Sequence, residues 1–465
     1  MVKTLLRQDN TVEIELRAVQ RQVKLLSGQP TSVWTYEARR IRGDVSIKHL
    51  DSFVGPVIRV RRGQRFIARF INQISETTTV HWHGLNVPEH ADGHPKDSVP
   101  PGGQRVYEFE IINRAGTYWF HPHPDMRTGR HVWNGLAGML IVRDDEEPIE
   151  QLDDVEDMPI ILQDRTFNAS NQIVYSIVGM EGALGNRILV NGRPNYAAKV
   201  TPSCYRLRIL NGSNTRIYKL AFDNMPMVAI GTDGGLLHQA VEKPYIALAP
   251  GERVDLWVDF SRFHPGQSVP LRSLPFSATG IGQGPLPNGA GFEVMRFDIR
   301  PGHRGYTRLP RPLASKIPTP DQKEAVNYTN PRALPISFDR GRFLLNGAAF
   351  RLTEVASNER VRLKDTEVWT FANTTGTMIM PHPIHLHGPS FRVIERTIQN
   401  VHRANWEAMR EGYTDEGWKD TILLMPGESA KILINFGPYD GLFLYHCHML
   451  EHEDQGMMRN YLVYR

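Results

Sequence analysis

The sequence has few cysteines and no marked excess of charge of either sign. Its 465 residues include two cysteines, Cys204 and Cys447, which excludes a framework of several disulfides. Fifty-four lysines and arginines oppose fifty aspartates and glutamates, for a net charge of +4. Binding to nucleic acid or to a membrane surface requires a concentrated basic patch, so this balance predicts neither partner. The abundant metal-binding group is imidazole, because the chain contains eighteen histidines.

Long apolar runs are also missing. No stretch reaches the roughly 18 uninterrupted apolar residues of a transmembrane helix, so we expect no membrane insertion. Residues 1–8 lack the apolar run of a signal peptide. Two possibilities stay open at this point: a cytosolic protein, or one whose leader has been removed.

Helical periodicity is scarce, whereas alternation of polar and apolar residues is frequent. Residues 105–111, 205–210 and 253–260 are examples. This period of two predicts half-buried strands, and many short strands separated by Gly, Pro and Asn predict β-sandwiches. The sequence therefore predicts an all-β fold.

Two segments without periodicity divide the chain into three parts of similar length. One is strongly acidic and spans residues 144–157, and the other is rich in proline and spans residues 301–335. We expect three consecutive sandwich domains, with the following bounds: 1–147, 148–305 and 306–465.

The three parts repeat one motif, a Pro-Gly turn followed by an alternating strand. It occurs at Pro101-Gly102, Pro250-Gly251 and Pro426-Gly427. In the first and third copies a His-x-His pair follows the turn at the same distance, and the middle part has no such pair. We therefore expect the middle domain to bind no metal.

Four His-x-His pairs occur where chance predicts fewer than one. They are His81/His83, His121/His123, His385/His387 and His446/His448. Residues i and i+2 of a strand share one face, so each pair directs two imidazoles toward the same place. A single pair is more often a polar strand face, but four pairs at matching positions predict eight ligands for several metal ions held close together.

A second group of metal-binding residues lies in the third domain. Cys447 stands between two of these histidines, His452 and Met457 follow it, and His382 precedes it in the chain. Two His, one Cys and a weak axial Met form the ligand set of a blue-copper site. Taken singly, Cys447 would be interpreted as a small buried apolar residue, and Met457 as a residue that fills space in the core. Together they predict a copper that takes up electrons, joined through the covalent neighbours of Cys447 to a cluster suited to dioxygen.

The chain resembles the multicopper oxidases, and within them the bacterial laccase-like branch that includes spore-coat laccase, the copper-efflux oxidase and bilirubin oxidase. The resemblance spans the whole chain and rests on four motifs in family order: His81-Trp-His-Gly84, His121-Pro-His123, His382-Pro-Ile-His-Leu-His-Gly388, and the segment from His446 to Met457. It implies three cupredoxin-like Greek-key sandwiches, with a copper cluster between the first and third.

The resemblance also implies four coppers per chain and a role for each ligand. The type 1 ligands would be His382, Cys447, His452 and Met457, the type 2 ligands His81 and His385, and the ligands of the type 3 pair His83, His121, His123, His387, His446 and His448. The implied reaction is one-electron oxidation of phenols or aromatic amines, coupled to four-electron reduction of dioxygen to water. We expect a monomer; the family suggests a periplasmic, secreted or spore-coat location.

Two other functions are considered beside the laccase. The first is a metallo-oxidase acting on Cu(I), Fe(II) or Mn(II), which the scattered methionines do not favour, since the copper-efflux branch carries a long Met-rich insert. The second is a copper-binding member without activity, which the complete ligand set argues against.

Three acids are candidates for catalytic roles. Asp92 and Glu453 match acids that the family places near the cluster, and reduction of dioxygen requires a proton relay. A turn role for Asp92 and a solvated position for Glu453 are the alternatives. Asp420 matches an acid of related bacterial members and is expected to hold a type 1 imidazole in its tautomer, with a turn or ion pair as the alternative.

Two segments depart from the family pattern. Residues 124–130 replace the usual His-Gly continuation after His123, so this edge of the cluster is expected to differ. Residues 397–417 contain Trp406 and Tyr413 and form either a wall of the substrate pocket or a plain surface excursion.

Overall fold

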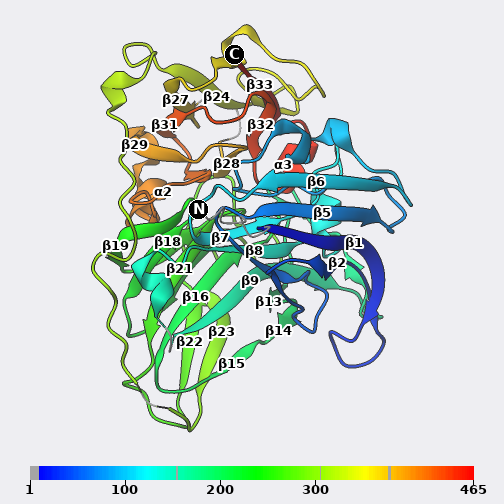
Figure 1. Cartoon of the computed structure of the whole chain (residues 1–465), viewed down its shortest axis with the longest axis vertical. Coiled ribbons are helices and arrows are strands. Elements are labelled where there is room, and N and C mark those ends of the chain that lie inside the picture. The colour runs from blue at the N-terminus through cyan, green and yellow to red at the C-terminus, as the bar shows by residue number, and fades with distance from the viewer. Residues whose placement is uncertain (1–9, 153–154, 304, 375–378) are drawn as a thin grey trace, which may run out of the picture.

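The computed structural model describes residues 10–152, 155–303, 305–374 and 379–465, and strands form most of them. The strands form three pairs of sheets, and each pair is built from one continuous stretch of chain (Figure 1). In Figure 1 the N-terminal stretch is blue to cyan, the middle stretch is green and fills the lower part of the view, and the C-terminal stretch is orange to red at the top. The expected all-β class is confirmed.

The first pair of sheets holds a core that includes Trp82, Tyr107 and Phe120. Its sheets have the orders β2-β1-β5-β6 and β3-β4-β8-β7. The strands are β1 (Thr11–Val23), β2 (Thr31–Arg42), β3 (Ser46–Lys48), β4 (Val57–Arg61), β5 (Arg65–Asn72), β6 (Gln104–Glu110), β7 (Gly116–Phe120) and β8 (Gly138–Arg143).

The middle pair encloses a separate core that includes Leu207, Leu256 and Phe297. Its sheets have the orders β14-β13-β9-β16-β21-β18-β19 and β15-β23-β22-β17-β20, with β10 paired to β9 and a small hairpin formed by β11 and β12. The strands are β9 (Glu156–Phe167), β10 (Ile173–Val174), β11 (Ile177–Val178), β12 (Gly182–Ala183), β13 (Arg187–Val190), β14 (Arg193–Pro194), β15 (Ala197–Val200), β16 (Cys204–Asn211), β17 (Tyr218–Phe222), β18 (Met227–Thr232), β19 (Gly235–Lys243), β20 (Ile246–Leu248), β21 (Arg253–Asp259), β22 (Ser268–Ser273) and β23 (Phe292–Ile299).

The third pair packs around Trp369 and Phe371, and Cys447 and Met457 belong to the same core. Its sheets have the orders β25-β24-β27-β31-β29 and β26-β33-β32-β28-β30. The strands are β24 (Arg332–Asp339), β25 (Arg342–Leu345), β26 (Arg360–Arg362), β27 (Thr366–Ala372), β28 (His382–Leu386), β29 (Phe391–Ile398), β30 (Thr421–Leu424), β31 (Glu428–Asn435), β32 (Gly441–Cys447) and β33 (Met458–Tyr464).

Helices are short and lie in the connections. The α-helices are α1 (Thr128–Trp133), α2 (Arg403–Glu407) and α3 (Leu450–Asp454). Single 3-10 turns span Glu89–Ala91, Pro95–Asp97, Pro148–Gln151, Gln322–Glu324, Ser357–Glu359, Asn400–His402 and Arg410–Gly412. Within the described part of the chain, no helix has the length and apolarity needed to cross a membrane.

The repeated Pro-Gly turns have one backbone geometry. Gly102, Gly251 and Gly427 have φ values of 76°, 86° and 78°. This left-handed region costs glycine nothing and is unfavourable for residues with a Cβ atom, which explains why glycine recurs. The turns lead into strands β6, β21 and β31.

Candidate metal centre

Strand pairing brings the C-terminal histidines together. In β28 and β32, His385 is paired with His446, and Ile384 is paired with Cys447. Adjacent residues of a strand face opposite sides of the sheet, so His446 and Cys447 point to different faces. The first sandwich supplies the remaining histidines, and an isolated bridge joins His81 to His121.

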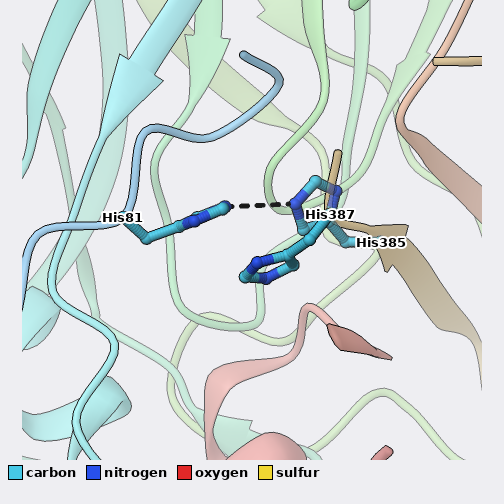
Figure 2. A group of neighbouring side chains, drawn as sticks. All are labelled: His81, His385 and His387. Atoms are coloured by element: carbon cyan, nitrogen blue, oxygen red, sulfur yellow. Dashed lines mark hydrogen bonds between the residues drawn. The ribbon is translucent and has the colours of Figure 1, made fainter. Parts of the chain in front are cut away.

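His81 and His385 form a facing pair. Their Nε2 atoms lie 3.4 Å apart. The Nδ1 of His81 donates to the backbone oxygen of Asp92 at 2.7 Å, and the Nδ1 of His385 donates to the backbone oxygen of Asp420 at 2.9 Å. A carbonyl oxygen only accepts, so both Nε2 atoms carry a lone pair directed into the space between the sandwiches. Figure 2 shows His81 on one side and His385 and His387 on the other.

His83, His121 and His448 form a second group. Nδ1 of His83 lies 3.4 Å from Nε2 of His121, whose own Nδ1 donates to the Pro122 carbonyl at 2.8 Å. The His448 ring centroid lies 4.9 Å from that of His83 and 5.3 Å from that of His121. Among the described residues neither ring nitrogen of His448 has a hydrogen-bond partner, although the side chain is fully buried.

His123, His387 and His446 form a third group. Nε2 of His446 lies 3.3 Å from Nε2 of His123 and 3.2 Å from Nε2 of His387. The three side chains are buried. This group therefore joins one histidine of the first sandwich to two of the third.

Cys447, His382 and His452 meet on the other face of β32. The Cys447 sulfur lies 3.4 Å from Nδ1 of His382 and 3.7 Å from Nδ1 of His452. Met457 is fully buried, and its backbone oxygen accepts from the Cys447 N–H at 3.0 Å. Cys204, the other thiol, is also free and lies in the core of the middle sandwich.

Burial lowers the pKa of nearly all of these imidazoles below the usual value. The pKa of His121 falls to about 3 and that of His452 to about 4, in each case chiefly through desolvation. In the cluster the neighbouring imidazoles add to the effect, as for His81 and His387. Burial also raises the pKa of the Cys447 thiol. The histidines with a lowered pKa are therefore neutral and present lone pairs, as metal ligands must.

This donor set fits copper. Lone pairs of neutral imidazoles face one another at 3.2–3.4 Å, and one buried ring has no hydrogen-bond partner among the described residues. Buried polar atoms in such an arrangement are satisfied by a cation. Eight imidazoles in one place, with a thiol and two imidazoles beside them, are nitrogen and sulfur ligands of the kind that copper prefers.

Asp92 and Glu453 both lie beside the histidine cluster. Oδ2 of Asp92 accepts from Nδ1 of His387 at 2.8 Å. Burial, and secondarily the carboxylates of Glu89 and Asp97, raises the pKa of Asp92 well above its usual range. The Glu453 carboxylate lies 3.1 Å from Nδ1 of His446 and 3.6 Å from Nε2 of His123.

Both acids are almost fully buried, Asp92 at 0% and Glu453 at 2% exposure. The alternative of a solvated Glu453 is therefore wrong.

Asp420 lies in a different place from the one expected. Its carboxylate accepts from Nε2 of His83 at 3.0 Å, and its backbone oxygen accepts from His385, so its partners are cluster histidines instead of a type 1 imidazole. The reason is the register of β28 and β30, which pairs His385 with Thr421, the residue after Asp420. Burial alone would raise the pKa of Asp420, but the Arg253 guanidinium holds this pKa well below its usual range.

The segment at residues 124–130 docks onto the segment that carries His452 and Glu453. The backbone N–H groups of Thr128 and Gly129 donate to the Asp454 carboxylate at 2.8 and 2.9 Å. On the same helix α3, Glu451 accepts from Tyr175, Asn214 and Thr215 of the middle sandwich. All three sandwiches thus meet at α3.

The middle sandwich contributes groups that the sequence patterns did not indicate. The Met180 carbonyl, between β11 and β12, accepts from Nε2 of His452 at 2.9 Å. A Cβ atom on Gly251 would lie 2.9 Å from the His448 ring, so glycine is required for this close approach. Arg253 binds Asp420 with two nitrogens. The repeated Pro250-Gly251 motif indicated the turn in the sequence. No sequence pattern indicated the contacts of Met180 and Arg253.

We expect the copper-free protein to lose stability steeply as the pH falls below about 6.5, the value for an unfolded histidine. Nine of the ten ligand histidines have a lowered pKa in the folded state. Between the folded and unfolded pKa values the unfolded chain binds protons that the folded chain does not. Each such histidine then costs about 1.4 kcal/mol per pH unit, and the loss is absent above pH 6.5.

The measurement is the thermal midpoint of copper-free protein from pH 8 to pH 4.5. A flat profile across this range would show that these imidazoles are not held neutral. Copper should restore the midpoint at mildly acidic pH, because bound metal competes with the protons.

Comparison with known proteins places the chain in a family. Two profiles described as multicopper oxidase match residues 30–147 and 318–465. The chain is 32% identical to a laccase of Bacillus subtilis, with 92% of this chain and 90% of that one covered. It is 29% identical to a bilirubin oxidase of Albifimbria verrucaria, with 87% and 70% covered.

Solved structures agree with this placement. The McoA multicopper oxidase of the hyperthermophile Aquifex aeolicus superposes with a TM-score of 0.83 at 33% identity, over 97% of this chain and 96% of that one. A multicopper oxidase of Pediococcus acidilactici gives 0.80 at 34% identity, over 98% and 88%. The expected cupredoxin-like architecture is confirmed. The chain belongs to the multicopper oxidase family, the copper-dependent oxidoreductases that use dioxygen as acceptor.

Proposed function

We propose that the protein is a laccase that oxidises phenols and aromatic amines by one electron at a time and reduces dioxygen to water. The observation that carries the proposal is the convergence of eight buried imidazoles beside the Cys447 site. Cys447 and the cluster ligand His446 are adjacent residues of strand β32. Relatives named laccase and bilirubin oxidase support it. We propose one chain as the working unit, with domains at 1–147, 148–305 and 306–465.

The proposed site holds four coppers. The type 1 copper would be held by His382, Cys447, His452 and Met457, and the type 2 copper by His81 and His385. The ligands of the type 3 pair would be His83, His121 and His448 for one ion and His123, His387 and His446 for the other. The three groups of facing nitrogens support this division.

Bound copper would supply the one-electron redox chemistry that protein side chains lack. The chain supplies a short covalent connection, because Cys447 is bonded through the backbone to His446 and His448, which face the cluster. All three side chains are fully buried. This connection favours transfer of electrons taken up at Cys447 to the cluster.

Asp92 and Glu453 would supply protons for the reduction of dioxygen. The Asp92 carboxyl is held by His387 through Oδ2, while Oδ1 has no hydrogen-bond partner among the described residues and is free to carry a proton. Glu453 lies against two other histidines of the cluster, His123 and His446. Two carboxyl groups beside the cluster would supply the protons that reduction of dioxygen consumes.

The reductant would bind where the middle and third sandwiches meet. His452 is fully buried, and its Nε2 donates to the Met180 carbonyl. A substrate would therefore bind against the hairpin of β11 and β12, which covers this histidine. Residues 397–417 border this region: Asn405 and Thr279 exchange two hydrogen bonds, and Gly280 packs against Met380. The same segment also packs on Tyr245 of the middle sandwich, which supports a wall of the substrate pocket over a plain surface excursion.

We expect the replacement Trp406→Ala to raise KM for bulky phenols several-fold and to leave kcat nearly unchanged. Trp406 is half-buried and lies in α2, beside Asn405. Its removal would take away a contact surface for substrate without altering the copper ligands. Steady-state kinetics with a small and a bulky phenol measure the effect, and Tyr306→Ala, a change of an exposed aromatic residue, is the control. Identical kinetics for both phenols would contradict this placement.

The function is tested by oxygen uptake of copper-loaded protein with a panel of reductants. The laccase proposal predicts a blue protein that consumes one dioxygen for four equivalents of a phenol and releases no peroxide. Preference for Cu(I), Fe(II) or Mn(II) over all phenols would assign a metallo-oxidase instead. A blue protein without oxygen uptake would refute both.

A further inference from the structure

Arg253, at the start of β21 in the middle sandwich, makes hydrogen bonds to all three sandwiches. Its Nε donates to the Thr117 carbonyl of the first sandwich at 3.0 Å. Within its own sandwich it donates to the carbonyls of Gly251 and Asp233, both at 2.9 Å. In the third sandwich, the Asp420 carboxylate accepts two hydrogen bonds, at 2.8 Å from Nη1 and 2.6 Å from Nη2. All five N–H donors of the guanidinium are therefore used, and the side chain is fully buried.

Asp420 transmits this contact to the cluster. The oxygen that accepts from Nη1, Oδ1, also accepts from Nε2 of His83 at 3.0 Å and from the Thr421 hydroxyl at 2.9 Å. Because an ionised carboxylate only accepts, His83 must carry its proton on Nε2. Its Nδ1 lone pair then faces Nε2 of His121, 3.4 Å away, inside the cluster.

We propose that Arg253 is a positioning residue for the copper cluster: it fixes Asp420, and Asp420 fixes His83 in the tautomer that directs Nδ1 at the metal. The middle sandwich binds no metal in the proposed assignment, yet it sets the orientation of a ligand of the first. This inference rests on the assignment of the histidine cluster to copper.

The neighbourhood of Arg253 supports a positioning role over a generic ion pair. Asp233 accepts from the Arg253 backbone N–H at 2.7 Å and pairs with Lys419 at 2.9 Å, so the residue before Asp420 is anchored as well. Gly251, two residues before Arg253, packs directly against the His448 ring. The same turn of the middle sandwich thus approaches His448 directly and reaches His83 through Asp420.

Arginine is required here because of its shape. A lysine keeps the charge but has three rotatable donors on one nitrogen. It cannot bind both carboxylate oxygens of Asp420 while also reaching carbonyls of the first and middle sandwiches. Residues that orient metal ligands typically change metal affinity about 10–100-fold when they are replaced. We expect Arg253→Lys to weaken copper binding at the cluster by that factor while the Cys447 site stays loaded.

The matched control is Arg208→Lys. Arg208 is also fully buried and lies on the neighbouring strand β16. It donates to Thr117 across the junction with the first sandwich and to Asp255 of its own sandwich, and through these bonds it contacts none of the ligand histidines. If any arginine at this junction were sufficient to explain the effect, both variants would lose copper equally. If Arg253 positions the ligand, only Arg253→Lys loses copper.

The experiment compares wild type and both variants after dialysis against a graded copper chelator. The readouts are copper per chain, the blue absorption of the Cys447 site, and the electron paramagnetic resonance of the remaining coppers. The proposal predicts that Arg253→Lys loses cluster copper at a chelator concentration about 10–100-fold lower than the wild type does. The blue absorption of the Cys447 site should stay unchanged. Equal retention of all copper in the two variants would overturn it, and a wild type that loads no cluster copper would overturn the proposed function as well.

A second measurement does not depend on folding of the variant. In copper-free wild type labelled with ¹⁵N-histidine, the nitrogen shifts of His83 report which ring nitrogen carries the proton. The proposal predicts Nε2, and a proton on Nδ1 would overturn it.

Discussion

We expect Cys447→Ser to remove the blue colour and nearly all turnover while the fold and the cluster copper remain. Serine is close to cysteine in size, so the buried position between His382 and His452 stays filled. A hydroxyl is a poor ligand for copper compared with a thiolate, which removes the site of electron uptake. A fall in kcat on the order of 10³-fold, equivalent to about 4 kcal/mol, is the expected result.

The matched control is Cys204→Ser. Cys204 is also a buried free thiol, but it lies in the middle sandwich, with Asp259 and the Thr307 carbonyl as its neighbours. This variant should stay blue and active. If Cys447→Ser kept a substantial part of the activity, electron uptake through Cys447 would be refuted.

Asp92→Asn is expected to lower kcat by about 10²–10⁴-fold, the usual contribution of a positioned acid or base. The amide oxygen of asparagine can still accept from Nδ1 of His387, so the ligand keeps its orientation. What is lost is the proton held by the carboxyl group. In stopped-flow measurements, reduction of the blue site by substrate should be unchanged, whereas reoxidation by dioxygen should become slow.

The control for this change is Asp97→Asn, which alters a nearby acid whose ion pairs are with Lys96 and Arg105. It should reoxidise at close to the wild-type rate, because burial is the main cause of the raised pKa of Asp92 and Asp97 contributes less. If Asp92→Asn slowed reduction and reoxidation alike, or lost copper, the carboxyl would be acting on ligand geometry and not on proton supply.

Much of this protein could be predicted from its sequence, because the determining patterns are local. Alternation in 253–260 predicted the strand observed as β21. The His-x-His pairs were expected on strands, but His387 and His448 lie just beyond the ends of β28 and β32, and the pairs of the first sandwich lie outside its strands. The spacing between Pro-Gly turns and His-x-His pairs predicted that the first and third sandwiches would supply the cluster. Cys447 between His446 and His448 predicted two sites on opposite faces of one strand, which the register of β28 and β32 produces.

The contacts between sandwiches could not be predicted in the same way. Asp420 was linked to a type 1 imidazole, but the pairing of His385 with Thr421 places it beside His83. Arg253 and the Met180 carbonyl come from the sandwich that has no His-x-His pair, and no local pattern distinguishes them from other buried groups. Such contacts depend on how three separately folded units pack, and a single sequence carries little information about that packing.

The central claim is that twelve residues of the first and third sandwiches hold four coppers in two connected sites. Anomalous diffraction at the copper absorption edge from crystals of copper-loaded protein tests it most directly. The account predicts one peak among His382, Cys447 and His452, and three peaks enclosed by the eight histidines of the His-x-His pairs. An empty histidine cluster, or copper bound outside these residues, would contradict it.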